Sequence, residues 1–262
     1  AATLTAECPK GSIDLDMAEE NFGVEAGAII VATGWRPYDA TKLDNLGFGQ
    51  HQNIVTNVMM ERLAARNGPT GGEITRPSDG AKAANVAFVQ CAGSRDENHL
   101  PYCSAVCCMG SLKHIRYLRE FNPEAKATMF YIDIRTIGRH EKFYTDLTGD
   151  ENVRFVKGKA AKITGDAGTG NLTVEVEDTI EGRNLTEEFD LVVLATGIVP
   201  NGGVPLEISR DAYGFAERET GVPGVFAVGC AVRPGDVSRA TKEATAAALK
   251  AIQTLHAHEG EA

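Results

Sequence analysis

The chain of 262 residues is long enough for one large or two ordinary domains, and 43% hydrophobic with 24% charged residues is the composition of a globular protein. Its formal net charge of -10 argues against nonspecific nucleic-acid binding, because contact with phosphates requires a basic surface. No apolar run approaches the roughly 20 residues that span a bilayer and no signal peptide is recognisable, so we expect a cytoplasmic protein that meets a membrane only through partners.

The first predicted element is a buried strand in GAIIVATGWRP, residues 27–37. A second segment, DLVVLATGIVPN at 190–201, repeats its pattern: apolar β-branched residues, then Ala-Thr-Gly, then a nearby proline. The repeat predicts two related strand-and-turn units. Residues 39–82 are rich in Gly, Pro and Asn and are expected to be connecting loops around one short helix, VMMERLAARN.

A separate unit is predicted between the two copies. It begins with the strand NVAFVQC, continues with a helix in CSAVCCMGSLKHIRYLREF and returns to a strand in ATMFYIDIRTIG. Further strands are expected in VRFVKGKAAKIT, NLTVEVED and EEFDLVVLATG, with GDAGTGN (165–171) as a hairpin loop. A strand-helix-strand order predicts parallel pairing, and hence an α/β fold.

The last predicted elements are a strand in GVFAVG and an alanine-rich helix with Asp236 or Ser238 as its N-cap. The start of such a helix suits an anionic or carbonyl oxygen of a ligand, with plain capping as the alternative. No glycine fingerprint stands between a first strand and its helix, as a complete dinucleotide site requires. We therefore expect the chain to lack the first part of such a domain.

Four of the six cysteines lie within eighteen residues: Cys91, Cys103, Cys107 and Cys108. They stand where a nucleotide-binding unit would have its phosphate loop. Cys103 and Cys107 are four apart, so a helix would place them on one face. Four thiolates can hold a [4Fe-4S] cluster. Structural zinc remains an alternative, although no CxxC pair is present, as do four reduced thiols without metal.

Several segments together resemble the A-subunit family of heterodisulfide reductase, and within it the flavoprotein A-subunit of the quinone-interacting membrane-bound oxidoreductase (Qmo). They span nearly the whole chain and include VATGWRPYD, GPTGGEITRPSDG, FVQCAGSRDENHLPYCSAVCCMGSLKH, FYIDIRTIGRHEKFY and GVFAVGCAVRPGDVSRA. The resemblance implies a two-dinucleotide-binding-domain flavoprotein of thioredoxin reductase type. Residues 1–38 and 198–262 would form a partial FAD domain, 39–82 a connecting segment, and 83–197 an inserted unit like a pyridine-nucleotide domain.

The resemblance also implies cofactors and site residues. A [4Fe-4S] cluster would be bound by Cys91, Cys103, Cys107 and Cys108, so NAD(P)H is not expected in the inserted unit. FAD contacts would come from Thr33, Gly34, Gly229, Cys230, Asp236 and Val237, with Cys230 in place of the aspartate common in such flavoproteins. Cys8 is expected to be inert. Six charged residues in the family-like segments are expected to form ion pairs, or else to line the flavin or couple it to the cluster: Arg76, Asp79, Arg95, Asp96, Asp133 and Arg135.

The function implied is electron transfer between FAD and the cluster in a multi-subunit oxidoreductase. Its partners would be redox subunits of a Qmo-type or heterodisulfide reductase-type complex, including adenylylsulfate reductase. Without a pyrophosphate loop, the isolated chain is expected to bind little FAD and to be inactive. The alternative function is a noncatalytic docking module with structural zinc or no metal.

Overall fold

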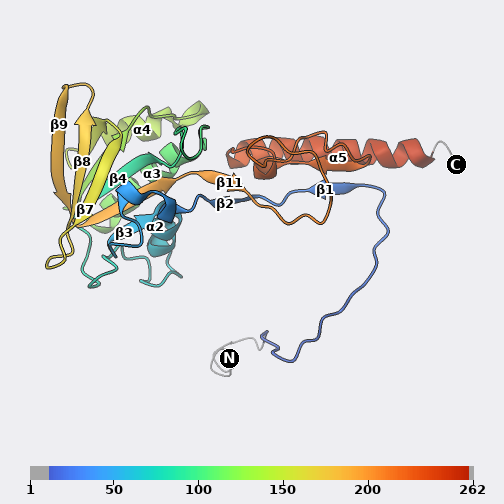
Figure 1. Ribbon diagram of the computed structural model, residues 1–262, viewed down its shortest axis with the longest axis horizontal. Coiled ribbons are helices and arrows are strands. Elements are labelled where there is room, and N and C mark those ends of the chain that lie inside the picture. Colours follow the sequence, from blue (N-terminus) through green and yellow to red (C-terminus); the bar gives the residue numbers. More distant parts are fainter. Residues whose placement is uncertain (1–11, 260–262) are drawn as a thin grey trace.

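A computed structural model describes residues 12–259, which leaves Cys8 outside the described part (Figure 1). The main body contains a five-stranded sheet in the order β3-β10-β4-β5-β6. Every neighbouring pair in it is parallel, which confirms the predicted α/β class and pairing. The strands are Ile54–Thr56 (β3), Asn85–Ala92 (β4), Lys126–Tyr131 (β5), Val153–Lys157 (β6) and Leu191–Thr196 (β10).

Layers on both faces cover this sheet, so β10 is buried along its whole length and β4 along nearly all of it. One face packs against three helices: Asn57–Ala64 (α2), Cys107–Phe121 (α3) and Glu141–Thr148 (α4). Leu112 and Ile115 of α3 meet Phe88 of β4 and Met60 of α2 in this core.

The opposite face packs against an antiparallel sheet of Ala160–Gly165 (β7), Leu172–Asp178 (β8) and Arg183–Phe189 (β9). β8 alternates buried and more exposed side chains because only one of its faces is covered. Its Val174 packs with Val89 of β4 and Leu194 of β10.

A smaller part of the molecule pairs Ile29–Val31 (β1) in parallel with Val225–Ala227 (β12), beside the long helix Val237–Glu259 (α5). A 3-10 turn, Gly229–Ala231 (η4), follows β12. Ile29 and Ile30 remain 42% and 43% exposed, unlike the residues of the central parallel strands. No helix within residues 12–259 combines the length and apolar character needed to cross a membrane.

A two-stranded antiparallel ribbon joins the two parts in Figure 1, formed by Trp35–Pro37 (β2) and Ile198–Pro200 (β11). Each strand of the ribbon follows one copy of the Ala-Thr-Gly repeat. The repeat found in the sequence therefore marks the two points at which the chain passes between the parts.

One expectation for residues 39–82 is wrong. The short helix predicted there is α2, but the segment also supplies β3, which forms the edge of the parallel sheet beside β10. Three further 3-10 turns are Ala40–Lys42 (η1), Asp44–Leu46 (η2) and Gly138–His140 (η3). The segment is thus partly a structural element of the main body.

Candidate four-cysteine site

The candidate site begins where β4 ends. Cys91 is the penultimate residue of this strand, is 8% exposed, and has a φ of 55°, in the left-handed region that residues with side chains rarely occupy. Among residues 12–259, only two other non-glycine residues have such a φ: Arg95 at 55° and Ala105 at 63°. All three lie in the segment that carries the cysteines, so unusual backbone geometry is concentrated there.

Cys103 lies in the loop before α3, not on the helix as its spacing from Cys107 predicted. The left-handed φ of Ala105 interrupts any helix that would include it, and the loop is instead held by buried serines. The Oγ atoms of Ser94 and Ser104 are 3.0 Å apart, and Ser104 Oγ accepts a hydrogen bond from the backbone N-H of Ile198 at 2.8 Å. The cysteine loop is thereby attached to the start of the ribbon strand β11.

Cys107 and Cys108 are the first two residues of α3. Val106, at the N-cap position, offers no side-chain hydrogen bond to the helix start. Cys107 Sγ donates to the carbonyl of Thr196 at 3.5 Å, and Cys108 Sγ donates to the carbonyl of Asp133 at 3.8 Å. The two thiols therefore rest against the carboxyl ends of β10 and of the segment after β5.

All four cysteines line one cavity. With a volume of about 10 Å³, it has room for roughly one water molecule. Within residues 12–259, no group of three or more His, Cys, Asp or Glu side chains is spaced to hold a metal ion. A [4Fe-4S] cluster needs four sulfur donors, and this donor set is present around a single cavity, although its present spacing is not that of a loaded site.

Burial controls the protonation of these thiols. It raises the pKa of Cys91 to about 11 and that of Cys107 to about 12, and it raises the pKa of Cys108 as well. Neighbouring thiols add to these increases, since two thiolates close together repel. Without a metal the three groups stay protonated at neutral pH, and a metal that binds them must displace their protons.

Charged residues border the cavity on its open side. Arg95 Nη1 is 2.7 Å from Asp133 Oδ1, and Arg135 Nε is 3.3 Å from the same oxygen. The six charged residues singled out in the sequence all form ion pairs, as one of the expectations stated: Arg76 with Asp79, Lys159 with Asp96, and the two arginines with Asp133. Of the six, Arg95, Asp133 and Arg135 line the cavity of the cysteines.

The residues expected to contact FAD lie in the smaller part of the molecule. β1 and β12 run in parallel and in register, and Val228 N-H donates to Val31 O at 3.0 Å, so Thr33-Gly34 and Gly229-Cys230 follow the same edge of the pair. Gly34 and Gly229 have φ values of 72° and 63°. Their turns therefore need glycine.

Several of these groups are already engaged within the protein. Gly229 N-H donates to Glu243 Oε2 at 2.9 Å, and the half-buried Cys230 donates from Sγ to the carbonyl of Gly235 at 3.5 Å. Asp236 accepts a hydrogen bond from Arg239 N-H at 2.8 Å and so caps α5, while Val237 is 82% exposed. Cys230 does not line the cavity of the other four cysteines.

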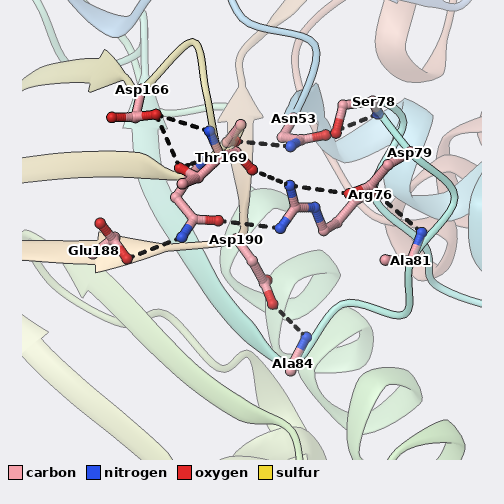
Figure 2. Close-up of polar contacts among 12 residues, drawn as sticks. Asn53, Arg76, Ser78, Asp79, Ala81, Ala84, Asp166, Thr169, Glu188 and Asp190 are labelled. Atoms are coloured by element: carbon pink, nitrogen blue, oxygen red, sulfur yellow. Dashed lines mark hydrogen bonds and ion pairs between the residues drawn. The ribbon is translucent and has the colours of Figure 1, made fainter.

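The glycine-rich segment 165–171 is the loop between β7 and β8, as predicted, and it opens no helix. Figure 2 shows how it is fixed. Arg76 donates from Nη2 to Thr169 O at 2.6 Å, and Asn53 donates from Nδ2 to Gly170 O at 2.8 Å. The N-H groups of Gly168 and Thr169 both donate to Asp166 Oδ1, so they are occupied within the loop itself.

Three residues that hold the cysteine loop were not predicted from the sequence: Tyr102, Ser94 and Ser104. Tyr102 precedes Cys103, donates from its hydroxyl to Ile198 O at 2.9 Å, and has its ring centroid 5.2 Å from that of Tyr213 and 5.4 Å from that of Phe215. Burial raises its pKa to about 12. Only their position beside cysteines in the family-like segment could have drawn attention to these residues, because their partners are distant in sequence.

Known structures with this arrangement are flavoproteins. The chain is similar to thioredoxin reductase of Lactococcus lactis, with a TM-score of 0.55 at 18% identity over 87% of this chain and 65% of that one. Thioredoxin reductase of T. acidophilum gives a TM-score of 0.52 at 15% identity over 88% of this chain and 66% of the other. The fold is that of a two-dinucleotide-binding-domain flavoprotein of thioredoxin reductase type.

The sequence itself belongs to the A-subunit family of heterodisulfide reductase. It is 38% identical over 263 residues to an iron-sulfur A-subunit (the second) of CoB-CoM heterodisulfide reductase from Methanopyrus kandleri, covering 95% of this chain and 40% of that protein. It is 38% identical over 271 residues to the A-subunit of the ferredoxin/F420H2-dependent CoB-CoM heterodisulfide reductase of Methanosarcina acetivorans, covering 97% of this chain and 34% of that protein. The chain thus spans about two fifths or less of the length of these relatives. No family model matches it.

Proposed function

We propose that the chain is part of an electron-transfer component of an oxidoreductase, with Cys91, Cys103, Cys107 and Cys108 as ligands of a [4Fe-4S] cluster. The carrying observation is that four free thiols from a strand end, a loop and a helix start line one cavity. When bound, the cluster would accept and release single electrons in exchange with FAD. The Methanopyrus relative, named as an iron-sulfur component of a reductase, supports this class of function.

The local backbone supports a binding role for this segment. Left-handed φ values at Cys91, Arg95 and Ala105 each cost on the order of 1–3 kcal/mol, so the surrounding structure must compensate for them. The start of α3 lacks a side-chain cap and would favour the negative charge of four thiolates. Ser104 and Tyr102 hold the loop against Ile198, so Cys103 is presented from an anchored position.

The FAD part of the proposal rests on the fold and on the paired ends of β1 and β12. Thr33, Gly34, Gly229, Cys230, Asp236 and Val237 would contribute contacts to the flavin from this edge. The division into a partial FAD domain (1–38 and 198–262) and an inserted unit (83–197) belongs to the same proposal. Because the Gly229 N-H and the Asp236 carboxylate already have partners, we expect flavin contacts mainly through other backbone groups.

The proposed partners are other redox subunits of a heterodisulfide reductase-type or Qmo-type complex, and in the second case adenylylsulfate reductase. The relatives support the first, since their names describe them as A-subunits of reductases that act on CoB-CoM heterodisulfide. The Qmo alternative rests on the sequence resemblance alone. In both, we place the protein in the cytoplasm, with any membrane association made by partner subunits.

A docking module with structural zinc, or with no metal, is the competing function. It is favoured by the small present volume of the cavity, since no ligand set for a metal ion is already assembled in residues 12–259. The two functions differ in what the cysteines bind, so metal analysis separates them.

The test is anaerobic purification, reconstitution with iron and sulfide, and measurement of iron, sulfide, zinc and the EPR spectrum after dithionite reduction. We expect about four iron per chain and a reduced-cluster EPR signal. The variant Cys107→Ser should lose both, whereas the matched control Cys230→Ser, outside the cavity, should keep them. Stoichiometric zinc, or folded protein without metal, would instead support the docking function.

A further inference from the structure

The four-cysteine cavity has a charged border made by residues from two different strand ends. Arg95 comes from the loop after β4, while Asp133 and Arg135 follow β5. Since β4 and β5 are neighbouring parallel strands, their carboxyl ends meet at one edge of the sheet and bring these residues together. All three line the same cavity as the thiols.

The position of Asp133 and Arg135 is informative. In a dinucleotide-binding unit, the end of the second strand carries the acidic residue that binds the ribose, or an arginine that accommodates a phosphate on it. In this chain those residue types stand at the corresponding place, after β4, α3 and β5. Their carboxylate and guanidinium groups, however, bond to each other and to Arg95, beside the cysteines.

Asp133 links this group directly to the thiols. Its carboxylate accepts hydrogen bonds from Arg95 at 2.7 Å and from Arg135 at 3.3 Å, and its backbone carbonyl accepts from Cys108 Sγ at 3.8 Å. Two guanidinium groups and one carboxylate leave one net positive charge at the border of the cavity. Arginine does not lose its proton in proteins, so this charge persists at any working pH.

We propose that Arg95 and Arg135, positioned by Asp133, raise the reduction potential of the group bound by the four cysteines. This inference rests on the proposed function. A positive charge nearby stabilises the more negative, reduced state, and charges and hydrogen bonds around the ligands are known means of tuning such centres. Arg95 should act more strongly, because its side chain is 25% exposed against 48% for Arg135 and is less screened by solvent.

The experiment is a redox titration of the reconstituted chain, followed by EPR, after its iron and sulfide content has been measured. Arg95→Gln and Arg135→Gln should each shift the midpoint potential to more negative values, Arg95→Gln by the larger amount. Arg135→Lys should restore most of the loss. Arg183→Gln, which removes the same charge from the exposed start of β9, should leave the potential unchanged.

Asp133→Asn distinguishes charge from loss of structure. It removes a negative charge and keeps the backbone carbonyl, so we expect a shift toward more positive potential, opposite to the arginine variants. Full iron content with unchanged potential in both Arg→Gln variants would overturn this proposal alone. A shift of the same sign in Asp133→Asn would also overturn it. An unsubstituted chain that binds no iron would overturn the proposed function, and this inference with it.

Discussion

At the scale of single residues, the second Ala-Thr-Gly turn and the cysteine loop depend on each other. Gly197 is buried, and a Cβ atom there would lie 2.4 Å from Ser94 Oγ and 2.6 Å from Leu100 Cδ1. Ser104 Oγ would be 3.0 Å away. The absence of a side chain at Gly197 is therefore what allows the cysteine loop to pack on the start of the ribbon.

Gly197→Ala should consequently lower the free energy of unfolding by about 1–3 kcal/mol, the usual cost of overpacking. Gly110→Ala is the matched control, since a Cβ there meets nothing within 4 Å and the position lies within α3. Removing a glycine from a helix should stabilise the chain by about 0.5–1 kcal/mol. Chemical denaturation of both variants measures the two effects. An unchanged midpoint for Gly197→Ala would mean that the loop and turn can separate freely.

The placement of Cys103 shows the limit of residue spacing as a guide. Its separation of four from Cys107 suggested one helical face, but helical spacing applies only where the backbone is helical. The left-handed φ of Ala105 ends the helix before Cys103. Such a φ is unusual for alanine and depends on contacts that are distant in sequence, so no local pattern predicts it.

At the scale of elements, the contact between α2 and α3 contains a buried histidine. His114 of α3 is 3% exposed, and its Nε2 is 2.7 Å from Glu61 Oε2 on α2. Burial lowers the pKa of His114 below its ordinary value of 6.5, despite the opposing effect of Glu61. The folded protein therefore binds this proton less readily than the unfolded chain does.

The stabilisation from neutral His114 is fully present above the unfolded pKa of 6.5 and is lost as the pH falls toward the lower folded pKa. We expect the free energy of unfolding to decrease between about pH 7.5 and 5.5. His114→Gln can keep a hydrogen bond to Glu61 without titrating, so its decrease in this window should be smaller. Equal slopes for the two proteins in denaturant titrations would contradict this assignment.

Elements were predictable where burial left a clear pattern. The apolar runs of β4 and β10 and the alternation of β8 are visible in the sequence because their faces are covered in regular ways. β3 was missed, since its three residues lie among loop-forming residues and form a strand only by pairing with β10. Asp133 and Arg135 could have been placed near the cysteines from the parallel order of β4 and β5.

At the scale of the whole molecule, two parts with different proposed cofactors are joined by the β2-β11 ribbon. Tyr102 spans this junction, since it lies beside Cys103 and packs on Tyr213 and Phe215 from the segment before β12. Ala216 N-H in turn donates to Ala231 O in η4 at 2.8 Å. A continuous set of contacts thus connects the cysteine loop with the edge proposed to meet the flavin.

We predict that the isolated chain retains little or no FAD. The described part includes the paired β1 and β12, but no glycine fingerprint that would hold the pyrophosphate occurs in the sequence. The measurement is gel filtration after incubation with excess FAD, followed by the flavin absorbance of the protein peak. Stoichiometric flavin in that peak would contradict the prediction.

The central claim is that the four cysteines form one cluster site, and native mass spectrometry of the anaerobically reconstituted chain tests it most directly. The mass of the intact protein reports in one spectrum whether each chain carries an iron-sulfur cluster, a single zinc ion or nothing. We predict one dominant species with the added mass of a single [4Fe-4S] cluster. A dominant species with one zinc, or with the mass of the bare folded chain, would contradict the claim.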